Sequence, residues 1–113
     1  MTEALVPRAS EIDLSPVLGR RLTVLGSTGS VGAATIDVVR FVRNRHGGDA
    51  FPLQALTANG NVVLLAQQAR ELRPAVAVIG DISRKGELQE ALAGTGIEVA
   101  AGPEAIVEAA ARP

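Results

Sequence analysis

Residues 22–40 read LTVLGSTGSVGAATIDVVR, which is a short apolar run, a turn that contains three glycines, and the start of a helical pattern. A short apolar run that ends in a glycine-rich turn is typical of a buried parallel strand. The residues after the turn carry apolar or small side chains at helical spacing and predict an amphipathic helix of about twelve residues. Its expected inward positions are Val31, Thr35, Val38, Val39 and Val42.

The turn from Gly26 to Gly32 is typical of a loop that holds a dinucleotide. Gly26 turns the chain out of the strand, Gly29 leaves room for a pyrophosphate, and Gly32 lets the helix lie close to the sheet. The N–H groups ahead of the helix are expected to be unpaired and to point at the anion, aided by the helix dipole. They belong to Thr28, Gly29, Ser30 and Val31. A tight turn without a ligand is the alternative, because glycines also serve packing alone.

Strands and helices alternate along the rest of the chain and predict an α/β fold. We expect a Rossmann-like, doubly wound and mainly parallel sheet of about four strands, in three layers. Residues 21–113 are expected to form this domain, and residues 1–20, which contain two prolines, a loosely ordered N-terminal extension. The further strands are expected at residues 51–56, 75–79 and 97–100.

Several residues are expected to bound the later helices. Asn61 and Ser83 can cap the second and third helices with their side-chain oxygens. Arg73-Pro74 is expected to end the second helix, because the residue before proline avoids the helical region. Gly102-Pro103 opens the last helix, with proline at a favoured first-turn position.

The composition of the 113-residue chain excludes several classes of protein. Eleven Lys and Arg against twelve Asp and Glu give a net charge of −1, so no basic field exists to attract nucleic acid or an anionic membrane. The absence of cysteine excludes disulfide scaffolds and thiolate sites, and favours a cytoplasmic setting. No apolar run approaches the roughly 20 residues of a membrane-spanning helix. With one His and no Trp or Tyr, the chain is expected to hold a molecule rather than to react with one.

The loop after the second expected strand, residues 57–61, reads TANGN. At this place many NAD-binding proteins carry an acid that binds the ribose hydroxyls. No carboxylate is present here, and Asn59 and Asn61 together with N–H groups at the helix start can receive a 2′-phosphate. The loop therefore favours NADP over NAD. An ordinary turn in which Asn61 only caps the helix is the alternative.

The segments LTVLGSTGSVGAATIDVVR, ALTANGNV and LRPAVAVIGD together closely resemble the N-terminal region of the 1-deoxy-D-xylulose 5-phosphate reductoisomerase family. In that family this region binds NADPH. The resemblance implies that Thr28, Gly29, Ser30 and Val31 contact the phosphates of the cofactor and nearby groups. It also implies that Asn59, Gly60 and Asn61 receive the phosphate of the adenosine ribose. Many members have Lys or Arg where this chain has Gly60.

The resemblance further implies the activity of a whole enzyme. Members convert deoxyxylulose phosphate to 2-C-methyl-D-erythritol 4-phosphate with NADPH and a divalent metal, Mg or Mn, in the non-mevalonate synthesis of isoprenoid precursors. A homodimer and a sugar-phosphate substrate belong to the same expectation. The family's catalytic and metal motifs, such as LANKE and DSEH, are absent from these residues. We therefore expect a domain truncated before the catalytic domain, which binds NADPH without catalysis and carries no catalytic or metal-binding residue.

Two other hypotheses remain open. One is the N-terminal piece of another dehydrogenase, such as one similar to aspartate-semialdehyde dehydrogenase, and the GSTGSV stretch argues against it. The other is a free-standing dinucleotide sensor or interaction module, which agrees with the absence of a catalytic constellation. Arg40, Arg43 and Arg45 are expected to form a solvated helix face, with a contact to a cofactor phosphate as the alternative.

Overall fold

Four parallel strands form one sheet in the order β1, β2, β3, β4. The structure, a computed structural model, describes residues 22–48, 50 and 52–111, so the expected extension at residues 1–20 lies outside the described residues. The strands are β1 (Leu22–Val24), β2 (Leu53–Ala58), β3 (Val76–Ile79) and β4 (Glu98–Ala101). The predicted α/β class and parallel sheet are confirmed.

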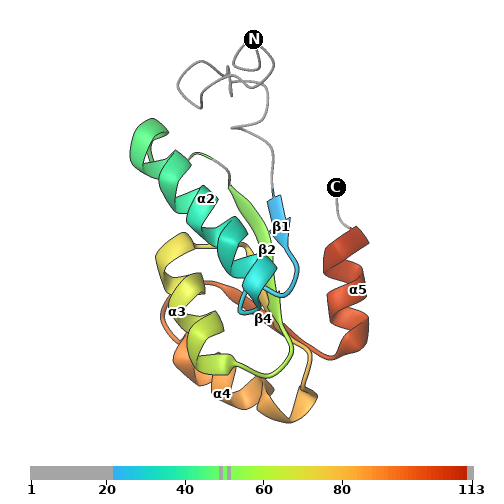
Figure 1. Cartoon of the computed structure of the whole chain (residues 1–113). Helices are drawn as coiled ribbons and strands as arrows, with labels where there is room; N and C mark the ends of the chain where they lie inside the picture. The colour runs from blue at the N-terminus through green and yellow to red at the C-terminus, as the bar shows by residue number, and fades with distance from the viewer. Residues whose placement is uncertain (1–21, 49, 51, 112–113) are drawn as a thin grey trace.

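Helices cover both faces of the sheet, which gives three layers (Figure 1). Three of them pack on one face and bury the larger core, which includes Ile36, Leu56, Leu65, Ile79 and Leu88. The last helix packs on the other face over a smaller cluster that contains Ala55, Val78 and Ala109. The helices are α2 (Ser30–His46), α3 (Val62–Leu72), α4 (Lys85–Ala91) and α5 (Pro103–Ala111), with a 3-10 turn, η3 (Ile82–Arg84), before α4.

Helix α2 buries only part of the stripe that its sequence predicts. It has 17 residues rather than about twelve, and its buried positions are Gly32, Ile36, Val39 and Val42. The side chains of Val31 and Val38 are 82% and 56% exposed, so the prediction that they face inward is wrong. Val39 and Val42 are buried as predicted, and Ile36, which the predicted stripe left out, is buried as well.

The boundaries of the later elements follow the predicted signals with small shifts. The expected strand at 51–56 lies at Leu53–Ala58, so Thr57 and Ala58 belong to the strand and not to the loop. The Asn61 cap is confirmed, because its side chain accepts a hydrogen bond from the Leu64 N–H at 3.1 Å. The Ser83 cap is wrong. Asp81 accepts the Ser83 N–H at 3.0 Å, because its carboxylate closes a 3-10 turn that precedes α4.

Candidate functional site

The two loops singled out in the sequence lie beside each other at the carboxyl edge of the sheet. The glycine loop, residues 26–32, follows β1, and the asparagine loop, residues 59–61, follows β2. Strands β1 and β2 are hydrogen-bonded neighbours, with Val24, the last residue of β1, opposite Leu56 of β2. In open α/β sheets this edge, outside the carboxyl ends of the strands, is where ligands bind.

The three glycines of the glycine loop serve different purposes. Gly26 has a φ of 65°, a left-handed conformation that few other residues adopt. A Cβ on Gly32 would lie 2.0 Å from the Gly26 carbonyl oxygen, so the start of α2 presses against the loop's own backbone. Gly29 has an ordinary extended backbone, and a Cβ there would meet only that carbonyl oxygen, at 3.4 Å. Neither conformation nor internal packing therefore demands a glycine at position 29.

The start of α2 presents several amides without partners. The N–H groups of Thr28, Ser30 and Val31 have no hydrogen-bond acceptor within the part of the chain that the structure describes, as predicted. The prediction is wrong for the Gly29 amide, which donates to the Gly26 carbonyl at 3.0 Å and closes the turn. Neither α2 nor α3 carries an acidic residue in its first turn, so neither of these two helix starts opposes an anion with a carboxylate.

Hydrogen bonds to β2 and α3 hold the backbone of the glycine loop. Thr57 accepts the Gly26 N–H on its hydroxyl at 3.0 Å and the Ser27 N–H on its carbonyl at 2.8 Å. Gln68 of α3 donates its side-chain Nε2–H to the Ser27 carbonyl at 3.0 Å. Neither support was predicted from the sequence, because the expected strand ended at Leu56 and because the Gln68 contact spans 41 residues. The available signal was a glutamine in phase with the buried stripe of α3, three residues after Leu65.

The asparagine loop combines exposed side chains with a helix start. Asn61 uses its Oδ1 for the cap, which bears out part of the alternative explanation of this turn. Asn59 is exposed, and a Cβ on Gly60 would have nothing within 4 Å. The Asn59 carbonyl accepts the Asp81 N–H at 2.9 Å, which ties this loop to the one after β3.

Asp81 brings a carboxylate to the same edge of the sheet. Its Oδ1 accepts the backbone N–H and the hydroxyl of Ser83, at 3.0 and 2.5 Å, and Arg84 lies 3.6 Å from Oδ2. The hydrogen bonds from the Ser83 hydroxyl and backbone hold the pKa of Asp81 below its usual range. Asp81 is therefore an ionised helix-start cap whose charge is partly offset by Arg84.

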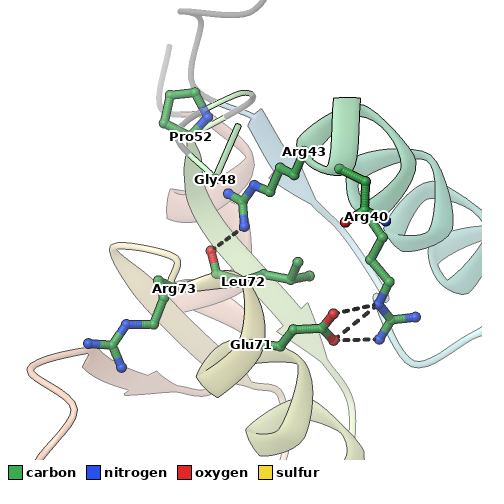
Figure 2. A pocket seen from close by; sticks show the side chains of 8 residues that line it. Arg40, Arg43, Gly48, Pro52, Glu71, Leu72 and Arg73 are labelled. Carbon is green, nitrogen blue, oxygen red and sulfur yellow. Dashed lines mark hydrogen bonds and ion pairs between the residues drawn. The ribbon is translucent and has the colours of Figure 1, made fainter. Parts of the chain in front are cut away.

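A cleft of about 700 Å³ lies at the opposite, amino edge of the sheet, between the ends of α2 and α3 (Figure 2). Arg40 binds both carboxylate oxygens of Glu71, at 2.7 to 3.0 Å. Arg43 donates to the carbonyls of Ala50 and Leu72, at 2.9 and 2.8 Å. Arg40 and Arg45 are exposed, as expected of a solvated helix face, whereas Arg43 is half-buried. Arg40 and Arg43 hold α2 to α3 through these hydrogen bonds. They lie at least ten residues beyond the helix start, about 15 Å at 1.5 Å per residue, so they are remote from the glycine loop.

Residues 22–48, 50 and 52–111 contain no group of three or more His, Cys, Asp or Glu that could hold a metal ion. His46 is exposed at the end of α2. None of the helices in these ranges has the length and apolar character needed to cross a membrane.

The chain is similar to known proteins of one family. A family model described as 1-deoxy-D-xylulose 5-phosphate reductoisomerase matches residues 22–113. A reductoisomerase of this name from Rhizobium meliloti is 54% identical over 95 residues, which cover 84% of this chain and 24% of that protein. One from Rhodospirillum centenum is 52% identical over 94 residues, covering 83% of this chain and 22% of its own length. The chain thus spans about a quarter of the length of these relatives.

Solved structures of the same enzyme share the fold. The Zymomonas mobilis enzyme in complex with NADPH matches with a TM-score of 0.71 and 47% identity, over 80% of this chain and 23% of that chain. A reductoisomerase in complex with magnesium matches with a TM-score of 0.68 and 26% identity, over 80% and 22% of the two chains.

Proposed function

The chain belongs to the 1-deoxy-D-xylulose 5-phosphate reductoisomerase family, and we propose that residues 21–113 form the NADPH-binding domain of such an oxidoreductase. The Zymomonas mobilis relative, 47% identical, was solved in complex with NADPH. The observation that carries the proposal is the pairing of two loops at one sheet edge, one with unpartnered amides and the other without a carboxylate.

The glycine loop is the proposed site of the diphosphate. The amides of Thr28, Ser30 and Val31 would donate to its oxygens, with the positive end of the α2 dipole behind them. Gly29 would contribute space rather than a hydrogen bond, since its N–H is already used within the turn. Neither backbone conformation nor packing requires a glycine at position 29. A ligand that lies against the loop would account for it, because a side chain there would occupy the ligand's space.

The asparagine loop is the proposed site of the 2′-phosphate. Asn59 has an exposed carboxamide, and Gly60 has no side chain to block the phosphate. The Oδ1 of Asn61 caps α3, so its side-chain NH₂ is available to donate. These groups are neutral, so we expect a preference for NADPH over NADH that is weaker than a Lys or Arg would give.

The bound nicotinamide supplies the hydride, and the residues of this chain bind and orient the dinucleotide. We propose that the whole enzyme carries out the reduction and isomerisation of deoxyxylulose phosphate, with a sugar phosphate as substrate, as a cytoplasmic homodimer. The described residues offer no ligand set that fits a divalent metal, so we assign no metal ligand among them.

Calorimetric titration of the 113-residue chain with NADPH and NADH tests the proposal. We expect saturable binding of NADPH, tighter than that of NADH, and its loss in Gly29→Val, whose side chain would fill the space given to the diphosphate. Gly48→Val is the matched control, because Gly48 lies by the cleft at the amino edge and a Cβ there meets nothing within 4 Å. If the two variants bind NADPH with equal affinity, the glycine loop is not part of the NADPH site.

A further inference from the structure

Three polar side chains are buried in the part of the chain that the structure describes, and each of them lies in the glycine loop or is hydrogen-bonded to it. Ser27, Thr57 and Gln68 are 0%, 2% and 4% exposed. They come from the loop itself, from β2 and from α3. Their contacts join segments that are 31 and 41 residues apart in the sequence. The backbone of the glycine loop is therefore held by a small polar cluster within an otherwise apolar core.

The cluster is not fully satisfied. Within the described residues, the Oγ of Ser27 and the Oε1 of Gln68 are buried without a hydrogen-bond partner. A buried polar atom without a partner is destabilising, and an apolar side chain of similar shape would avoid that cost. The neighbouring buried positions of α3, including Leu65, Ala66, Ala69 and Leu72, are apolar. Packing alone therefore does not explain an amide at position 68.

The hydrogen bond of Gln68 has a geometric consequence for the next amide. The peptide bond between Ser27 and Thr28 is trans, because the described residues contain no cis peptide bond. In a planar trans peptide the C=O and the N–H point in opposite directions. Since the Ser27 carbonyl points at Gln68 Nε2, 3.0 Å away, the Thr28 N–H points away from α3. That N–H has no acceptor within the described ranges.

We propose that Gln68 is a positioning residue: by holding the Ser27 carbonyl, it fixes the Thr28 amide in the direction from which it donates to a cofactor phosphate. Thr57 secures the amides of Gly26 and Ser27, so the contact from Gln68 is the side-chain hydrogen bond that orients the Ser27–Thr28 peptide. The inference rests on the proposed function, because it takes the diphosphate to lie at this loop. Gln68 itself is only 4% exposed, so in this proposal it acts through the loop backbone and not by contact with the cofactor.

Four variants of the 113-residue chain test the role of Gln68. Gln68→Met keeps the size of the side chain and removes the donor, and Gln68→Glu replaces the donor with a titratable carboxyl. Gln67→Met and Gln67→Glu are the controls, because Gln67 is the exposed neighbour on the same helix. Calorimetry with NADP⁺ is expected to show that Gln68→Met binds about tenfold more weakly than Gln67→Met, the loss of roughly one hydrogen bond to a charged group.

The pH dependence of NADP⁺ binding to Gln68→Glu distinguishes a positioning role from a merely structural one. An ionised carboxylate cannot donate to the Ser27 carbonyl, whereas a protonated carboxyl can. Burial raises the pKa of a carboxyl, so its protonated form is accessible in mildly acidic solution. Relative to the unsubstituted chain at each pH, the NADP⁺ affinity of Gln68→Glu should recover between about pH 8 and pH 5.5. That of Gln68→Met should stay low throughout.

The outcomes separate this inference from the proposed function. If the unsubstituted chain binds NADP⁺ but Gln68→Met binds as well as Gln67→Met, the positioning role is wrong and the proposed function stands. If the unsubstituted chain binds neither NADP⁺ nor inorganic pyrophosphate, the proposed function fails for this chain. Nuclear magnetic resonance of the cofactor-free chain tests separately whether Gln68 orients the Thr28 amide. A Thr28 amide signal that shifts in Gln68→Met and not in Gln67→Met supports it, and an unchanged signal overturns it.

Discussion

Replacing Gly32 by Ala is expected to destabilise the chain, although the same change stabilises most helices. A Cβ at position 32 would lie 2.0 Å from the Gly26 carbonyl oxygen and 2.7 Å from the Cα of Ser27. The first contact is about 1 Å shorter than real Cβ contacts allow, and backbone atoms cannot turn aside as a flexible side chain can. Either α2 or the glycine loop must therefore move.

The magnitude follows from two opposed effects. Alanine gains about 0.5–1 kcal/mol over glycine within a helix. Forcing an extra methyl into a packed contact typically costs about 1–3 kcal/mol, and a backbone neighbour places this site at the upper end. We therefore expect Gly32→Ala to lower the free energy of unfolding by about 1–2 kcal/mol. Movement of the glycine loop should also weaken NADPH binding.

Urea unfolding followed by far-ultraviolet circular dichroism measures this change, and Gly86→Ala is the matched control. Gly86 lies in α4, where a Cβ meets nothing within 4 Å, so alanine there should raise the free energy of unfolding by about 0.5–1 kcal/mol. If Gly32→Ala is as stable as Gly86→Ala, the close approach of α2 to the glycine loop is not a feature of the molecule.

Three further changes probe other parts of the account. Gly60→Arg should tighten NADPH relative to NADH in calorimetry, because the open space at Gly60 admits a guanidinium beside the 2′-phosphate, and an unchanged ratio would place that phosphate elsewhere. Asn61→Ala should lower the free energy of unfolding by about 1 kcal/mol through loss of the α3 cap, whereas Asn61→Asp, which keeps the accepting oxygen, should preserve most of it in urea titrations. The hydrogen bond from Arg40 lowers the pKa of Glu71 below its usual 4.5, so the pair stabilises the fold above that pH and the contribution disappears as pH falls through the folded pKa. Both side chains are nearly half exposed, so we expect at most about 1 kcal/mol, and an equal pH dependence of unfolding in Glu71→Gln would refute it.

The alternation of strands and helices could be predicted because its signals are local. The glycine-rich turn, the Asn61 cap and the Gly102-Pro103 helix start each depend on residues next to one another in the chain. The prediction for α2 was wrong at Val31 and Val38 because valines lie on both faces of this helix, and only the sheet beneath decides which face is covered.

The supports of the candidate site could not be predicted, because they are long-range hydrogen bonds. The contact between Gln68 and the Ser27 carbonyl spans 41 residues, and nothing near either residue indicates the other. The prediction that the Gly29 amide is unpaired was wrong for a local reason. A four-residue turn can close by its own hydrogen bond, which removes one donor from the set that a glycine motif suggests.

The most direct measurement is a crystal structure of the 113-residue chain grown with NADPH. The account predicts the diphosphate against the amides of Thr28, Ser30 and Val31, the 2′-phosphate beside Asn59 and Asn61, and the Gln68 contact to Ser27 intact. A dinucleotide bound in the cleft of Arg40 and Glu71, or a glycine loop left bare at saturating NADPH, would contradict it.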